Sequence, residues 1–127
     1  MERRDGRSAT GDSFSDWVTI GNGRLVFVAG QLARDDAGNV LGIGDVETQA
    51  RAVFGRVEQA LRAAGGDMRD IVKITTFLID IGDYPKFNKV RREFFPHQFP
   101  ASTAVAVRSL VRPEFLIEVE AIAVLDR

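Results

Sequence analysis

The residue types that most often do chemistry in small proteins are sparse in this sequence. It has no cysteine, which excludes thiol catalysis, disulfides and thiolate metal sites. Its single histidine, His97, cannot build a multi-histidine metal site by itself. His97 is either a proton carrier, since histidine changes charge near neutral pH, or an exposed residue of the Pro96–Pro100 loop. No spaced set of His, Asp and Glu predicts a metal ion, no glycine-rich phosphate loop is present, and we expect no cofactor.

The length and the charge of the chain limit the classes of protein to which it can belong. The 127 residues and 45% hydrophobic content suit one domain with a real core. Seventeen basic and eighteen acidic residues leave a formal charge of −1, so a nucleic-acid partner is not favoured. No apolar run reaches the roughly 18–20 residues that a membrane span needs. We therefore expect a cytoplasmic protein without a membrane partner, with residues 1–14 as a mobile tail and residues 15–127 as one domain.

The first half of the domain predicts a hairpin and a helix. Trp17–Ile20 and Arg24–Ala29 are expected to pair across a turn at Gly21-Asn22-Gly23, because Asn-Gly is a strong hairpin signal. Asp45 is a plausible N-cap for a helix running to about Ala64. Its apolar residues, spaced three and four apart, predict one buried stripe: Val46, Ala50, Val53, Phe54, Val57, Leu61 and Ala64.

The second half predicts three further strands and a second helix. Ile71–Ile81 is rich in β-branched residues and is typical of a strand. Asp83 is expected to cap a helix that has Pro85 in its first turn. Ser102–Leu110 and Leu116–Leu125 are expected to be the last two strands. The order β-β-α-β-α-β-β predicts an α+β fold with two helices on one face of a sheet.

The other face of that sheet needs a cover. Alternation along the last strand separates Glu118, Glu120 and Ile122 from the opposite face of Val119, Ala121 and Ala123. Neither face is uniformly polar, yet two helices can cover only one of them. Self-association is the simplest second cover; the alternative is a single sheet with a modestly apolar exposed face.

Five segments in order resemble the RidA/YjgF family of reactive-intermediate deaminases, whose older label is endoribonuclease L-PSP. Phe27-Val28-Ala29-Gly30-Gln31 resembles the family's Ser-Gly-Gln turn. Asp70–Leu78 is similar to its "DIVKTTVFL" strand, and Phe87–Val90 with Glu93–Phe95 to its second helix. Phe99-Pro100-Ala101 and Ile117–Ala123 resemble its "FPAR" and "IEIEAIAV" segments. The resemblance covers roughly Trp17–Val124.

The resemblance implies a fold, an assembly and an activity. The fold is chorismate-mutase-like, of the bacillus type, and three copies form a homotrimer with a central barrel. Clefts between subunits hydrolyse small imines or enamines, such as 2-aminoacrylate, to a keto acid and ammonia. Other family members carry endoribonuclease or translation-inhibitor labels.

The resemblance also implies site residues. Glu118 matches the family's water-positioning glutamate, which would make it a general base; Glu120, two residues on, is its internal rival. Asn88 matches a cleft asparagine, although it is equally compatible with an ordinary exposed helix residue. Trp17 falls at or beside the cleft tyrosine, and a core tryptophan is the alternative. Gly30 lies at the turn before the cleft, where its expected role is backbone shape.

Two residues depart from the family pattern. Ser102 occupies the position of the arginine that holds the substrate carboxylate, and a serine hydroxyl cannot reproduce a bidentate guanidinium contact. Ala29 replaces the usual serine before Gly-Gln. These changes predict a substrate preference altered from 2-aminoacrylate. Arg108 and Arg24 are the basic residues considered as replacements, with surface solvation as the alternative for each.

Three function classes follow from these observations. The favoured one is an imine or enamine deaminase acting on C–N bonds. The second is a trimer that binds a small metabolite without turning it over. The third, an endoribonuclease or translation inhibitor, is disfavoured because the chain has no net basic charge.

Overall fold

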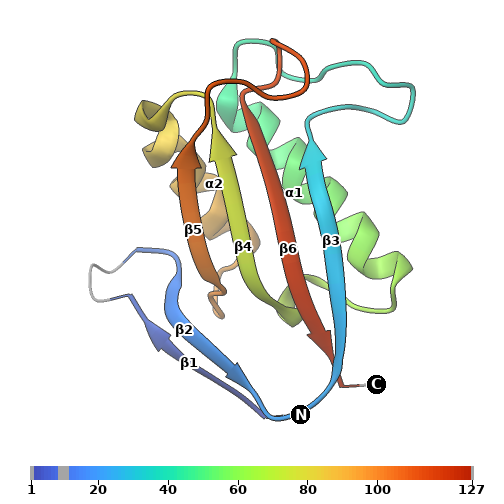
Figure 1. Cartoon of the computed structure of the whole chain (residues 1–127), viewed down its shortest axis with the longest axis vertical. Coiled ribbons are helices and arrows are strands. Elements are labelled where there is room, and N and C mark those ends of the chain that lie inside the picture. The colour runs from blue at the N-terminus through green and yellow to red at the C-terminus, as the bar shows by residue number, and fades with distance from the viewer. Residues whose placement is uncertain (1, 9–11, 127) are drawn as a thin grey trace.

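One sheet and two helices form the fold (Figure 1). The computed structural model describes residues 2–8 and 12–126. Within those residues, six strands are hydrogen-bonded in the order β1-β2-β5-β4-β6-β3. The elements in chain order are β1 (Arg3–Arg7), β2 (Ser15–Ile20), β3 (Arg24–Leu32), α1 (Val46–Ala63), β4 (Ile71–Leu78), α2 (Tyr84–Phe94), β5 (Ala101–Ala106) and β6 (Ile117–Leu125), with single-turn helices at Met68–Asp70 and Ile81–Asp83.

The two helices cover the same side of the β3-β6-β4-β5 portion of the sheet, which confirms the predicted α+β arrangement (Figure 1). Helix α1 begins as predicted, with the Asp45 side chain accepting hydrogen bonds from the Thr48 backbone N–H at 3.2 Å and the Thr48 hydroxyl at 2.7 Å. Its apolar stripe is buried as predicted, apart from the exposed Ala64 at its C-cap. It faces the sheet residues Ile74, Val119 and Ala121, so the hydrophobic core lies between the helix layer and the sheet.

Helix α2 links β4 to β5, which pair in parallel. A parallel pair needs a crossover of this kind, because a tight turn cannot return the chain to the same strand end. Pro85 lies in its first turn as expected, and Asp83 occupies the N-cap position without a side-chain capping bond. The buried face of α2 contains Phe87 and Val90, but also a charged residue, Arg91.

The predicted hairpin between the second and third strands is wrong. Strand β3 pairs with β6, from Arg24 opposite Leu125 to Leu32 opposite Glu118. Strand β2 pairs with β1 and joins β5 only at the pair Ser15 and Ala101, so β2 and β3 lie at different places in the sheet. The reason is that β6 offers β3 a long apolar partner strand, and the N-terminal segment supplies a separate partner for β2.

That N-terminal segment is the second difference from the sequence prediction, which placed residues 1–14 in a mobile tail. Residues 3–7 form β1, and the Arg3 guanidinium donates hydrogen bonds to the backbone oxygens of Ile71 at 2.7 Å and Phe99 at 2.9 Å. The polar composition of residues 3–7 does not predict a strand, because this strand is anchored by side-chain hydrogen bonds and not by apolar burial. Residues 9–11 lie outside the described part.

Strands β4 and β5 are shorter than predicted. Strand β4 ends at Leu78, because the Asp80 side chain accepts a hydrogen bond from the Gly82 N–H at 2.8 Å and starts a helical turn. Strand β5 runs from Ala101 to Ala106, so Arg108 belongs to the following loop. Within the described residues no helix is long and apolar enough to cross a membrane.

Candidate active site

Glu118 lies on the face of the sheet opposite the helices. It is in register with Phe77 of β4, and Phe77 is in register with Val105 of β5, so these three side chains form one row. The neighbouring residues of β6, Ile117 and Val119, are buried on the helix side. The alternation predicted for β6 is therefore confirmed, and Glu120 forms a second row with Thr75 and Thr103 on the same open face.

The Glu118 carboxylate is half-buried and unpaired. In the described part of the chain no group donates a hydrogen bond to it or forms an ion pair with it, although Gly30 and Glu120 lie nearby. Burial, and secondarily the negative charge of Glu120, raise the pKa of the Glu118 carboxyl above its ordinary value. A carboxylate with a raised pKa and free lone pairs can orient a water molecule and accept its proton.

Gly30 provides the space for that carboxylate. The pairing of β3 with β6 shifts register between Val28 and Gln31, which places Ala29 and Gly30 in a bulge beside Glu118. A Cβ atom on residue 30 would lie 2.8 Å from Cδ of Glu118, closer than real side chains approach. Gly30 does not have a positive φ. Gly30 therefore lies in strand β3 and not in the turn expected from the sequence, and its missing side chain lets the carboxylate approach the backbone.

Ser102 and Asn88 lie on the other side of the sheet. Ser102 is in register with the buried Ile74 and faces α2, where its Oγ accepts a hydrogen bond from Nη1 of Arg91 at 2.8 Å. The Asn88 Oδ1 accepts from Nη2 of Arg91 at 2.9 Å. A single chain therefore divides the expected site residues into two groups, one with Glu118 on the open face and one around Arg91.

Arg91 is a buried charged residue beside the expected site residues Ser102 and Asn88 that sequence reasoning missed. Its side chain is 1% exposed, and its guanidinium donates hydrogen bonds to four side-chain oxygens: Ser13 Oγ, Ser102 Oγ, Tyr84 Oη and Asn88 Oδ1. Its position four residues after Phe87 is the signal that could have found it, because that spacing places it in the buried stripe of α2. Arg24 and Arg108, which the sequence offered as replacement bases, are exposed.

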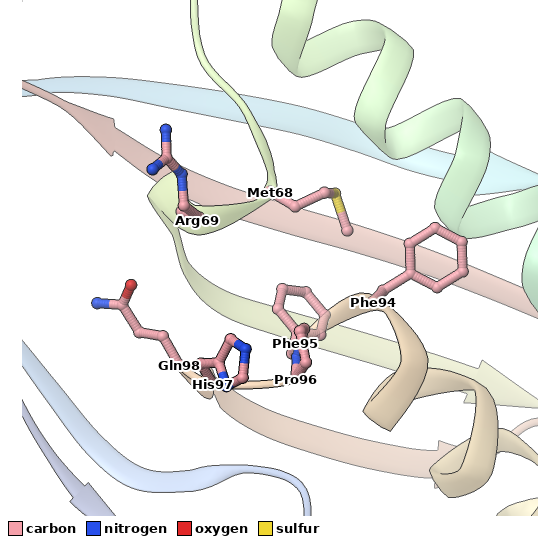
Figure 2. Close-up of a pocket in the computed structure, with 7 residues that line it drawn as sticks. All are labelled: Met68, Arg69, Phe94, Phe95, Pro96, His97 and Gln98. Atoms are coloured by element: carbon pink, nitrogen blue, oxygen red, sulfur yellow. The ribbon is translucent and has the colours of Figure 1, made fainter.

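Trp17 and His97 have different surroundings. The Trp17 indole is 50% exposed and packs over Gly6 of β1, so the alternative of a core tryptophan is wrong. His97 is exposed in the loop between α2 and β5. It lines a hollow of about 200 Å³ with Met68, Phe94 and Phe95 (Figure 2), and neither Glu118 nor Ser102 borders this hollow. Among the described residues no group of three or more His, Cys, Asp or Glu side chains is arranged to hold a metal ion.

Known proteins resemble this chain in sequence and structure. The family model described as endoribonuclease L-PSP matches residues 7–125. A 3-aminoacrylate deaminase, RutC, from Acinetobacter baylyi is 38% identical over 99 residues, which are 78% of each chain. A 2-iminobutanoate/2-iminopropanoate deaminase from Dermatophagoides farinae is 31% identical over 113 residues, covering 89% of this chain and 86% of the relative.

A solved structure agrees with these sequence matches. The Rid family protein YyfB from Yersinia pestis, described as of unknown function, superposes with a TM-score of 0.88 at 29% identity. The match covers 98% of this chain and 100% of that one. The five sequence segments, the family model and the shared fold lead to one conclusion: this chain belongs to the RidA/YjgF family of reactive-intermediate deaminases.

Proposed function

We propose that this protein hydrolyses the C=N bond of a small imine, or of an enamine after tautomerisation, with Glu118 as the general base. The observation that carries the proposal is the unpaired Glu118 carboxylate, held over Gly30 with a raised pKa. The similarity to proteins named as 3-aminoacrylate and 2-iminobutanoate/2-iminopropanoate deaminases supports this reaction class. The proposed substrate preference differs from 2-aminoacrylate, because Ser102 stands where the family has an arginine.

The chemistry needs one water molecule and one group that carries a proton. Glu118 accepts a proton from water as the water oxygen bonds to the imine carbon and the C=N π electrons move to nitrogen. Glu118 then returns the proton to nitrogen, which gives a carbinolamine. In a second proton transfer Glu118 takes the proton of the new hydroxyl group and delivers it to nitrogen, so that the C–N bond breaks as the C=O bond forms and ammonia leaves. The negative charge of Glu120 makes Glu118 a stronger base. A positioned general base typically contributes about 10²–10⁴ in rate.

We propose further that the open face is covered by other copies of the chain in a homotrimer with a central barrel. Leu25 and Phe27 of β3 are 61% and 72% exposed on this side, and Val105 of β5 is 40% exposed. Apolar surface of this kind is typical of an association face. A cleft between subunits would also bring Glu118 of one copy toward the Arg91 group of another, which a single chain holds apart.

The test of function is ammonia release. Imines and enamines of different size and charge are generated enzymatically and offered to the wild-type protein, Glu118→Gln and Glu120→Gln. We expect Glu118→Gln to lose turnover while remaining folded and Glu120→Gln to retain most of it. Full activity of both variants would refute Glu118 as the general base, whereas no ammonia release by the wild-type protein would favour a trimer that only binds a metabolite. The proposal does not include the endoribonuclease activity in the family model's description, because proteins that bind RNA usually carry a basic patch and this chain has a formal charge of −1.

A further inference from the structure

Arg91 is a buried cation with no carboxylate at ion-pair distance in the described part of the chain. It forms no ion pair within the residues that the structure describes, and the oxygens that accept its hydrogen bonds belong to neutral side chains. The rings of Phe14, Tyr84 and Phe87 surround it, with centroids 4.8–5.5 Å from Cζ. Burial lowers the pKa of Arg91 from its ordinary value, with Asp12 acting only as a weaker, opposing charge.

This arrangement favours an anion brought by a ligand. Hydrogen bonds to neutral oxygens satisfy four of the five guanidinium N–H groups but supply no negative charge, and Asp12 only partly offsets the effect of burial. Burial of a poorly compensated charge is costly. We call Arg91 and the four side chains that accept its hydrogen bonds the cluster: Ser13, Ser102, Tyr84 and Asn88. An anion close to the cluster would be attracted strongly, because little water screens the interaction. Helix α2 lies against the strands β4 and β5 (Figure 1), so the cluster occupies the junction between the helix layer and the strand that carries Ser102.

Two of the groups that accept hydrogen bonds from the buried cation are hydroxyls of half-buried residues. Ser102 Oγ and Tyr84 Oη each accept a hydrogen bond from Arg91, at 2.8 and 2.9 Å, so the hydrogen of each hydroxyl points elsewhere. Neither hydroxyl donates to an acceptor in the described part of the chain, and both residues are only half-buried. Ser13 differs, because its hydroxyl donates to Asn88. The cluster therefore has two unused O–H donors, both polarised by one guanidinium.

We propose that Ser102 and Tyr84, polarised by Arg91, bind the carboxylate of a small anionic imine or enamine. The inference rests on the proposed function only in identifying this anion as the substrate. Ser102 and Tyr84 touch the ligand, and Arg91 is a positioning residue that acts through them. The guanidinium on α2 thus takes over the task that an arginine at position 102 would perform, with one layer of hydroxyls between it and the anion. That extra layer supports the proposed substrate preference, which differs from 2-aminoacrylate.

The test measures anion binding without catalysis. Pyruvate is titrated calorimetrically into the wild-type protein, and hydroxyacetone, which has similar size but no carboxylate, is titrated as the neutral comparison. We expect pyruvate to bind and hydroxyacetone to bind at least about tenfold more weakly. Ser102→Ala and Tyr84→Phe should each weaken pyruvate binding about tenfold, and Arg91→Gln more, since hydrogen bonds to charged groups are worth more than neutral ones. Arg91→Lys should recover part of the loss.

Arg92→Gln is the matched control. Arg92 is the next residue on α2 and is exposed, so this variant makes the same change in charge but removes no hydrogen bond of the cluster; the Arg92 charge acts on Arg91 only through space. Its pyruvate affinity should fall far less than that of Arg91→Gln. A merely structural Arg91 would weaken both ligands together, whereas the proposed role predicts a selective loss for pyruvate. If Arg91→Gln does not fold, as judged by circular dichroism, Ser102→Ala and Tyr84→Phe still decide the matter because they retain Arg91.

Three results would overturn the inference: equal binding of pyruvate and hydroxyacetone by wild type, no pyruvate binding at all, or wild-type affinity in both hydroxyl variants. The ammonia assay separates this outcome from a failure of the proposed function. If hydrolysis depends on Glu118 but pyruvate affinity is unchanged in the cluster variants, the anion site is refuted and the deaminase is supported. Cluster-dependent pyruvate binding with no hydrolysis of any imine would refute the deaminase and support the anion site.

Discussion

Gly30→Ala is expected to lower the catalytic rate while changing the folding free energy little. The added Cβ would lie 2.8 Å from Cδ of Glu118 and 3.1 Å from its Cγ, whereas carbon atoms normally approach to about 3.5–4.0 Å. The carboxylate must therefore move by roughly 1 Å. Because it is the end of a flexible side chain, this movement costs little folding energy, but a displacement of about 1 Å can cost about 10²-fold in rate.

The assay compares kcat/KM for ammonia release with the midpoint of thermal unfolding. Gly55→Ala is the matched control, since a Cβ there meets nothing within 4 Å and lies inside α1. It should retain full activity and gain about 0.5–1 kcal/mol of stability, the usual effect of alanine over glycine in a helix. Wild-type kcat/KM in Gly30→Ala would refute the claim that the carboxylate must occupy the space over residue 30.

Three further predictions test the surroundings of the site. Glu120→Gln should move the acidic limb of the pH–rate profile to lower pH, because removing the Glu120 charge lowers the raised pKa of Glu118; an unmoved limb would exclude this coupling. Ser102→Arg should destabilise the fold by about 1–3 kcal/mol, because it places a second guanidinium against Arg91; in thermal unfolding, the double variant with Arg91→Gln should be more stable than Ser102→Arg alone. Light scattering should give about three times the 14.0 kDa monomer mass, reduced by Phe27→Glu on the exposed apolar face; a wild-type monomer would contradict the proposed assembly.

The sign of the pH dependence of stability also follows from Glu118. Its folded-state pKa is raised, so the folded protein holds this proton more tightly than the unfolded chain does. The contribution of Glu118 to stability therefore falls as the pH rises from the ordinary carboxyl pKa through the raised value. Glu118→Gln should consequently be no less stable than wild type at neutral pH.

Local patterns in the sequence were enough to predict the helix layer and the last strand. The three- and four-residue spacing from Val46 to Leu61 and the Asp45 cap fix α1, because both depend on neighbours within a turn or two. The alternation around Val119 fixes which face carries Glu118. Each of these features is encoded within one segment and needs no knowledge of distant partners.

Features that depend on distant residues were not predictable in this way. Arg3 of β1 donates hydrogen bonds to backbone oxygens nearly seventy and a hundred residues away. The cluster around Arg91 combines side chains from the N-terminal segment, α2 and β5. A motif comparison shows that Ser102 lacks a guanidinium, but it does not show that one arrives from a neighbouring helix.

Ammonia release by wild type and Glu118→Gln is the most direct test of the central claim. The protein is offered small imines generated in the same vessel, and ammonia is measured against the uncatalysed background. The account predicts Glu118-dependent turnover, with Glu118→Gln slower by about 10²–10⁴ and folded as judged by circular dichroism. Equal rates for the two proteins would contradict it, as would a wild-type rate no faster than the background.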